Sequence, residues 1–167
     1  MKLADAPEFD IRYSTLEDAA PLRKWLAAPG MLHWFPMSTP EEVQNAIQVW
    51  IGFCRISSSL TATYKGEPCG MGTLFLMPYR KVAHHCLFKI IVDPEFQRQG
   101  VATSLLRNLK HLAKNYFRLE LMHIEFFEDN PIEELLKKSN FREFARQERY
   151  VKEGDRYFSR ILMECDL

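Results

Sequence analysis

A short polar turn stands between a strand-like segment and a helix-like segment near the middle of the chain. Residues 87–92 are almost entirely apolar and predict a strand that stops at Asp93-Pro94, whereas residues 102–116 have the apolar spacing of a helix whose buried face runs from Ala102 to Tyr116. The turn between them reads Gln97-Arg98-Gln99-Gly100-Val101-Ala102. A strand that runs through a glycine turn into a helix points backbone N–H groups outward, with the positive end of the helix dipole behind them. The turn therefore predicts a binding site for an anionic group.

Two well-known phosphate loops do not fit this turn. The dinucleotide-binding loop requires three spaced glycines, and the nucleotide-triphosphate loop requires Gly-Lys followed by Ser or Thr. Gly100 allows backbone angles and a close approach that a side chain would obstruct, and the small Ala102 keeps the helix entrance open. An ordinary connection between a strand and a helix is the alternative explanation of the same residues.

The hexapeptide Gln97–Ala102 resembles motif A of the GNAT acetyltransferases, Gln/Arg-x-x-Gly-x-Gly/Ala, at every specified position. In that superfamily, motif A holds the pyrophosphate of the co-substrate acetyl-coenzyme A (acetyl-CoA), and the end of the preceding strand binds the acetyl carbonyl and the pantetheine. The resemblance therefore implies a set of cofactor-binding residues: Ile90, Ile91 and Val92 on the strand, and Arg98, Gln99, Gly100, Val101, Ala102 and Thr103 in the turn.

A second resemblance lies on the next predicted strand. The segment Ile124-Glu125-Phe126-Phe127-Glu128-Asp129-Asn130 resembles the L-E-V-x-x-x-N segment of the ribosomal-protein N-terminal acetyltransferases within the same superfamily. There the Glu is the general base and the Asn binds the cofactor, which implies Glu125 as the catalytic base and Asn130 as a pantetheine contact. On the residues alone, Glu125 could instead simply face solvent on an alternating strand.

The chain departs from that subfamily directly after Asn130. The subfamily continues as N-x-x-A-x-x-L-Y-x-K-x-G-F, with the Tyr as general acid, but this chain is one residue shorter up to Phe141. The Tyr position is therefore Leu136 or Lys137, so the usual acid is missing. Asn140 replaces the Gly, which is physically reasonable because Asn tolerates the left-handed conformation at a helix end.

The reaction that these resemblances imply sets chemical demands on the site. An amine of pKa about 10.4 is mostly protonated near pH 7, and making it neutral costs roughly 4–5 kcal/mol unless a base helps. Glu125 would relay that proton, and the Val92 amide would stabilise the oxyanion of the tetrahedral intermediate. Tyr150 or Tyr157 could replace the missing acid, although each would more often be a packing residue.

The resemblance implies an enzyme that transfers the acetyl group of acetyl-CoA, by direct attack, to a primary amine of a small molecule, a peptide or a protein. A non-catalytic acyl-CoA-binding regulatory module is the alternative, which the missing Tyr makes more credible than usual. The loop Pro29–Met37 is crowded with aromatic and sulfur side chains, so it either forms an apolar wall for the acceptor or folds onto the core. In relatives the C-terminal hairpin lines the cleft or a dimer interface, which leaves a monomer or a homodimer open.

The apolar periodicity predicts the elements that must position these residues. Helices are predicted at residues 16–26, 39–54, 102–116 and 132–138, and strands at 10–14, 60–65, 69–79, 84–92, 119–127, 142–151 and 156–165. This β-α-α-β-β-β-α-β-α-β-β order resembles that of the GNAT proteins over nearly the whole chain. It implies an α/β (mixed α+β) fold in one domain over residues 1–167, with a single twisted mixed sheet of six to seven strands, a splayed central pair and about four helices.

Composition narrows the classes of partner and compartment. The 22 basic and 22 acidic residues balance, so no overall charge attracts nucleic acid or an anionic membrane. No apolar run approaches the ~18 residues of a membrane helix, and residues 1–10 lack the apolar core of a signal peptide. The four cysteines lie scattered in apolar patterns without ligand spacing, so buried reduced thiols, no metal and a cytoplasmic location are expected. A catalytic cysteine stays open as a minor alternative.

Overall fold

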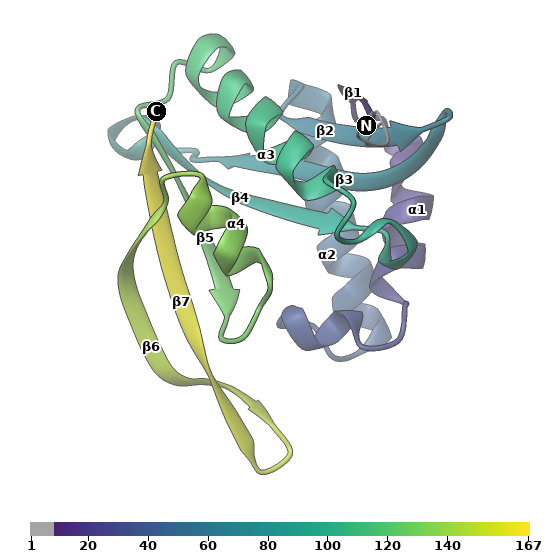
Figure 1. The fold of residues 1–167 in the computed structure, drawn as a ribbon, viewed down its shortest axis with the longest axis vertical. Helices are drawn as coiled ribbons and strands as arrows, with labels where there is room; N and C mark the ends of the chain where they lie inside the picture. Colours follow the sequence, from purple (N-terminus) through teal and green to yellow (C-terminus); the bar gives the residue numbers. More distant parts are fainter. Residues whose placement is uncertain (1–8) are drawn as a thin grey trace, which may run out of the picture.

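Seven strands form one mixed sheet in the order β1-β2-β3-β4-β5-β7-β6, and helices cover both of its faces (Figure 1). The strands are β1 (Asp10–Tyr13), β2 (Ser59–Tyr64), β3 (Glu67–Leu76), β4 (His85–Val92), β5 (Leu121–Phe127), β6 (Arg142–Glu153) and β7 (Arg156–Asp166). The α-helices are α1 (Ala19–Leu26), α2 (Pro40–Gly52), α3 (Val101–His111) and α4 (Ile132–Lys138). The predicted element order and the mixed class with a single sheet are confirmed.

This computed structural model describes residues 9–167. The expectation that no signal peptide is present concerns residues 1–10, of which the first eight lie outside the described part of the chain. Within residues 9–167, no helix has both the length and the apolar character needed to cross a membrane.

Local sequence explains where the helices begin and end. At the start of α2, the Thr39 hydroxyl accepts a hydrogen bond from the Glu42 N–H at 3.2 Å, and the Glu42 carboxylate accepts one from the Thr39 N–H at 3.0 Å. At the end of α4, the Phe141 N–H donates to the Leu136 carbonyl at 3.0 Å. Asn140 takes a left-handed φ of +67° there, as expected for Asn in the place of Gly.

The helix predicted to run to residue 116 is shorter than expected. α3 ends at His111 and is followed by one π-helical turn over Leu112–Tyr116. Tyr116, predicted to be buried, is instead 63% exposed. A π-helical turn holds more residues than an α-helical turn, so the 3.6-residue spacing no longer keeps this position on the buried face.

Two apolar cores lie on opposite faces of the sheet. The core on one face contains Phe88 of β4 together with Leu105 of α3. The core on the other face contains Ile91 of β4 together with Trp25 of α1 and Ile47 of α2. Because side chains alternate across a strand, β4 contributes to both cores and separates the α3 side of the sheet from the α2 side.

The two central parallel strands, β4 and β5, pair over only three positions. The pairing runs from His85 to Leu87 on β4 and ends at His123 on β5. Beyond this point β4 stays paired with β3 as far as Val92, and β5 stays paired with β7 as far as Phe127. The two halves of the sheet therefore diverge, which confirms the predicted splayed pair and leaves a gap between the facing strand edges (Figure 1).

Helix α3 lies close against β3 because two glycines face it. A Cβ atom on Gly70 would come within 2.7 Å of the Val101 side chain, and one on Gly72 would come within 2.6 Å of Leu109. Contacts this short force neighbouring groups to move, so a larger residue at either position would push against the helix. Val101 is the first residue of α3, and its contact with Gly70 therefore fixes where the helix begins relative to the sheet.

A buried carboxylate, Asp18, ties the first strand and the first helix to β2. It accepts hydrogen bonds from Arg12 at 2.8 and 2.9 Å, from the Thr15 N–H at 2.8 Å and from the Thr61 hydroxyl at 3.0 Å. Burial on its own would raise the pKa of Asp18, but the hydrogen bonds from Arg12, Thr15 and Thr61 outweigh it, so the pKa is lowered. The helical segment predicted from residue 16 begins here, as a short 3₁₀ turn over Leu16–Asp18 that leads into α1.

We predict that Asp18→Asn lowers the free energy of unfolding at neutral pH by roughly 2–4 kcal/mol, because charged hydrogen bonds to Arg12 are lost. Since the folded-state pKa is lowered, the contribution of Asp18 is complete above about pH 4 and is lost as the pH falls through the folded-state value. In urea unfolding, the difference in free energy of unfolding between wild type and variant should therefore disappear in acid. The control Asp10→Asn, at an exposed position, should change the free energy of unfolding by less than about 0.5 kcal/mol. A gap that keeps its size in acid would contradict this role.

Candidate active site

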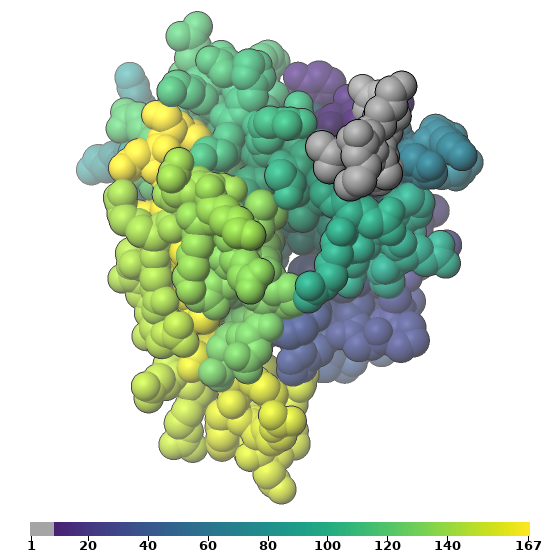
Figure 2. All heavy atoms as spheres, viewed as in Figure 1, coloured from purple at the N-terminus to yellow at the C-terminus, as the bar shows by residue number. Residues whose placement is uncertain are grey.

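Two pockets adjoin where β4 and β5 diverge. The larger pocket is bounded by the starts of α3 and α4, and the smaller one by β5, the C-terminal hairpin and the loop after α1. Both are lined by Trp34, Phe35, Ile90, Asn130 and Ile132, so the pockets meet at these residues beside the gap. Figure 2 shows the surface hollowed where the blue-purple loop after α1, the teal turn before α3 and the green segment before α4 meet.

The larger pocket brings together nine of the ten residues predicted to bind the cofactor: Ile90, Ile91, Val92, Arg98, Gly100, Val101, Ala102, Thr103 and Asn130. Its cavity volume is about 300 Å³, which is at the lower end of the range for small-molecule sites. Gln99 is not part of this lining, and its side-chain amide instead donates a hydrogen bond back to the Glu95 carbonyl at 2.9 Å.

The start of α3 presents free backbone donors to this pocket. Gly100 precedes the helix with a left-handed φ of +94°, and no side chain in the described part of the chain caps the helix. The first N–H groups of an α-helix have no partner within it, so those of Val101, Ala102 and Thr103 are available, with the positive end of the dipole behind them. A Cβ on Gly100 would meet no atom within 4 Å, so the glycine serves the backbone conformation and leaves the space before the turn open.

The end of β4 directs two backbone N–H groups into the gap between the half-sheets. The Asp93 N–H donates to the Cys69 carbonyl of β3 at 2.9 Å, so the backbone of Asp93 faces β3. Successive residues of a strand point their backbone groups to opposite edges, so the backbone groups of Val92 and Ile90 face β5, where strand pairing has ended. Ile91 lines the larger pocket, but its backbone faces β3.

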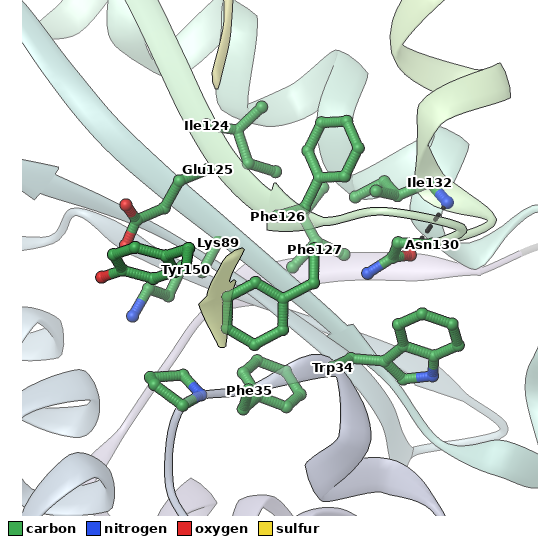
Figure 3. A pocket seen from close by; sticks show the side chains of 12 residues that line it. Trp34, Phe35, Lys89, Ile124, Glu125, Phe126, Phe127, Asn130, Ile132 and Tyr150 are labelled. Carbon is green, nitrogen blue, oxygen red and sulfur yellow. Dashed lines mark hydrogen bonds between the residues drawn. The ribbon is translucent and has the colours of Figure 1, made fainter. Parts of the chain in front are cut away.

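The smaller pocket has aromatic walls and four polar side chains (Figure 3). The polar side chains are Lys89, Glu125, Asn130 and Tyr150, and the aromatic ones are Trp34, Phe35, Phe126, Phe127 and the ring of Tyr150. Asn130 stands where the two pockets meet. Its side-chain oxygen accepts a hydrogen bond from the Ile132 N–H at 3.0 Å, which fixes the side chain and leaves its NH₂ group as a donor toward the pocket.

The loop Pro29–Met37 combines the two roles that its sequence left open. Met31 is buried in the core of α1 and α2, whereas Trp34 lines both pockets. His33 reaches the C-terminal hairpin, where its Nδ1 lies 3.1 Å from the Glu153 carboxylate. The loop therefore folds onto the core and also forms one wall of the pockets, opposite the hairpin.

Glu125 is half-buried on β5 and is held by a neighbour that sequence reasoning missed. Its carboxylate accepts a hydrogen bond from Arg160 of β7 at 2.9 Å. The same guanidinium donates to Gln147 of β6 at 2.9 Å and stacks over the Tyr150 ring, 4.3 Å from its centre. Glu125 therefore lies in the smaller pocket, and Arg160 fixes its orientation from the C-terminal hairpin.

Neither position that aligns with the missing Tyr lines a pocket. Leu136 is fully buried, and the Lys137 ammonium pairs with Glu133 at 2.7 Å on the surface of α4. Of the two hairpin tyrosines, Tyr150 lines the smaller pocket, whereas Tyr157 lies outside both pockets. Tyr150 is therefore the tyrosine that the hairpin brings to the site.

Lys89 is a second pocket residue that sequence reasoning missed, because it sits in an apolar strand pattern with no motif around it. Its ammonium lies over the rings of Phe75 at 5.3 Å and Trp50 at 6.0 Å, and its side chain lines the smaller pocket. Burial lowers the pKa of Lys89, and the negative charge of Glu125 opposes that fall only in part. This lysine is thus a cation that the fold has partly withdrawn from water.

The cysteines line neither pocket, and two of them have pKa values unsuited to nucleophilic chemistry. Burial raises the pKa of Cys86 to about 12, and burial together with the charge of Asp93 raises the pKa of Cys69 to about 11. Cys54, expected to be buried, is only partly buried, whereas Cys165 is buried as expected. Within residues 9–167, no group of three or more His, Cys, Asp or Glu side chains is arranged to hold a metal.

Comparisons with known proteins agree with one another. A model of the acetyltransferase (GNAT) family matches residues 19–141. Among curated proteins, L-amino acid N-acetyltransferase AaaT of Escherichia coli (strain K12) is 26% identical over 105 residues. That match covers 62% of this chain and 65% of the relative, so it spans slightly less than two thirds of the relative's length.

Solved structures resemble the chain over nearly its whole length. The structure of YncA from Salmonella typhimurium, with its cofactor acetyl-CoA, has a TM-score of 0.79 at 16% identity, covering 97% of this chain and 94% of that one. The ribosomal-protein-alanine N-acetyltransferase from Brucella melitensis has a TM-score of 0.78 at 18% identity, covering 95% of this chain and 98% of that one. At these identities the likeness concerns the fold alone.

The free N–H groups at the start of α3 lead to a prediction about anion binding. In a calorimetric titration, Gly100→Glu should weaken the binding of acetyl-CoA by at least about 30-fold, because a carboxylate would stand where the phosphates are expected. Gly66→Glu is the matched control, since Gly66 has a similar left-handed φ of +84° and lies outside both pockets. Wild-type affinity in both variants would contradict an anion site at this turn.

Proposed function

The chain belongs to the GNAT acetyltransferase family, whose model matches residues 19–141, and from that premise we propose how its two pockets serve acetyl transfer. An acetyl-CoA-dependent N-acetyltransferase was predicted from the motifs, and the family match supports an acetyl-CoA-dependent acetyltransferase. In our proposal the larger pocket binds acetyl-CoA and the smaller one binds a primary amine of a small molecule or a peptide. The amine attacks the thioester carbon directly, at the gap between β4 and β5.

One observation carries this proposal: the two pockets adjoin at the gap in the sheet. Five residues line both pockets, and all of them lie on the segments that border the gap or on the loop after α1. Direct transfer requires the amine nitrogen and the thioester carbon to come within about 3–3.5 Å of each other. Two binding sites separated by a wall could not meet that demand, whereas two sites that adjoin can.

The larger pocket suits acetyl-CoA in charge and in hydrogen bonding. The N–H groups of Val101, Ala102 and Thr103 would receive the pyrophosphate, because a helix N-terminus binds phosphate well. The Asn130 NH₂ group would donate to the pantetheine, and the outward N–H of Val92 would donate to the acetyl carbonyl. That donor gains strength as the carbonyl becomes an oxyanion, which favours the transition state over the bound thioester.

The smaller pocket supplies the proton transfers. Glu125 accepts a proton from the acceptor ammonium and passes it to the solvent, and the neutral nitrogen then forms a bond to the thioester carbon. The nitrogen gives its second proton to Glu125 as the carbon–sulfur bond breaks. The Tyr150 hydroxyl donates its proton to the departing thiolate and regains one from the solvent. Arg160 is a positioning residue, because it touches Glu125 and Tyr150 rather than the reacting atoms.

We predict that Glu125→Gln lowers kcat by at least about ten-fold while leaving the affinity for acetyl-CoA unchanged, since the amide keeps the shape but cannot accept the proton. Steady-state kinetics with an amine acceptor and a parallel calorimetric titration measure the two quantities. Glu120→Gln, an exposed position outside both pockets, is the control and should behave as wild type.

Normal turnover in Glu125→Gln would show that Glu125 is not the general base. Cofactor binding without turnover of any amine by the wild-type protein would favour the regulatory module instead.

The Tyr150 hydroxyl leads to a separate prediction. Tyr150→Phe keeps the ring against Arg160 and removes only the proton donor, so kcat should fall by about three- to thirty-fold, with little change in KM. Tyr157→Phe removes a hydroxyl from the same hairpin outside the pockets and should change neither value. Equal kinetics in the two variants would leave Tyr150 with a packing role only.

A further inference from the structure

One charged group in the smaller pocket, the ammonium of Lys89, has no counter-ion among residues 9–167. The Lys89 ammonium lies 5.3 Å from the centre of the Phe75 ring and 6.0 Å from that of Trp50. Within residues 9–167, no carboxylate oxygen comes within 4.0 Å of it. Aromatic faces attract a cation, but this attraction compensates only part of the cost of withdrawing an ammonium from water. A negative charge on a ligand would compensate more.

The other charges at this pocket are already matched. Arg160 donates to Glu125 at 2.9 Å and to Gln147 at 2.9 Å, so the one carboxylate on the pocket lining is held by a guanidinium. The remaining polar lining groups, Asn130 and Tyr150, add no full charge. Lys89 and Arg160 against Glu125 make two cations and one anion, which leaves one positive charge for an acceptor to balance.

The same balance disfavours acceptors that carry several positive charges. A polyamine or an amino sugar would need unpaired carboxylates, and the described lining offers none besides Glu125. Figure 3 shows the Lys89 amino group and the Glu125 carboxylate on the same side of the pocket, beside the Tyr150 ring. An acceptor whose amine and acid group lie close together fits this pair, and the aromatic walls fit an apolar portion of the same molecule.

We propose that Lys89 binds the acid group of the acceptor and that the acceptor is a free amino acid with an apolar side chain. In such a molecule the amine and the carboxylate share one carbon atom, so the amine faces Glu125 while the carboxylate pairs with Lys89. The apolar side chain packs against Trp34 and Phe127. This inference rests on the proposed function, to which it adds the acceptor class and the residue that selects it.

Acetylation of L-leucine and of L-leucinamide tests the role of Lys89. The two compounds share the amine and the side chain, but only the free acid carries a negative charge. Because their amines differ in pKa, the informative quantity is how the ratio of kcat/KM for acid over amide changes between variants. Lys89→Met keeps a long apolar side chain over Phe75 and Trp50 but removes the charge. In this variant the acid-to-amide ratio of kcat/KM should fall at least about 30-fold, mainly through a higher KM for L-leucine.

Two further variants control this experiment. Lys65→Met is the matched control, since Lys65 lies over the Tyr64 ring at 5.3 Å but outside both pockets, and its ratio should equal that of wild type. Lys89→Arg keeps the positive charge and should recover part of the preference for the acid. Titration with acetyl-CoA should give wild-type affinity for Lys89→Met, because Lys89 lines the smaller pocket and not the larger one.

The outcomes separate this inference from the function on which it rests. Normal turnover with an unchanged acid-to-amide ratio in Lys89→Met would overturn the role of Lys89 and leave the acetyltransferase proposal standing. A wild-type protein that acetylates only amines without an acid group would likewise overturn the role of Lys89 and leave the acetyltransferase proposal standing. Acetylation of Lys89 itself, seen as a mass increase on its peptide, would also overturn it, because the lysine would then be an acceptor. A wild-type protein that acetylates no amine would instead contradict the proposed function.

Discussion

Hydrogen-bond pairing between β4 and β5 stops after three positions, and the rest of the site depends on that interruption. Backbone N–H and C=O groups inside a protein normally find partners, so a strand edge that faces a gap is available to a ligand. β4 stays held by β3 and β5 by β7, so the gap is compatible with two intact half-sheets. One side of the gap leads to the free N–H groups at the start of α3, and the other leads to Glu125.

The two sides of the gap are supported by different parts of the chain. On the cofactor side, Gly70 lets α3 approach β3 closely enough to fix the start of the helix. On the acceptor side, Arg160 of β7 holds Glu125 and stacks on Tyr150, so the C-terminal hairpin sets the position of the base. The positive charges are divided in the same way: the N-terminus of α3 faces one pocket, and Lys89, which pairs with no carboxylate in the described part of the chain, lines the other. Each pocket thus offers positive charge to a negatively charged group, while the base lies in the smaller pocket.

The sequence predicted the features that contiguous residues determine. The hexapeptide Gln97–Ala102 forms the turn expected of it, because a glycine in a left-handed conformation and a following helix are local properties. Arg160 was missed because it meets Glu125 across 35 residues, through a strand register that no local pattern encodes. Lys89 was missed because a lone lysine in an apolar strand normally extends to solvent, and only the packing of α2 against β3 encloses it. Tyr116 was placed wrongly because one π-helical turn changes the period on which burial was predicted.

The most direct test of the central claim is a crystal structure of the protein with acetyl-CoA. The pyrophosphate should lie against the N–H groups of Val101–Thr103, and the thioester should lie between the ends of β4 and β5. Its carbonyl should accept a hydrogen bond from the Val92 N–H, with the acetyl group directed toward Glu125 and Tyr150. A cofactor whose thioester lies outside the gap, or strands that pair fully along their length, would contradict the claim that the interrupted pairing creates the site.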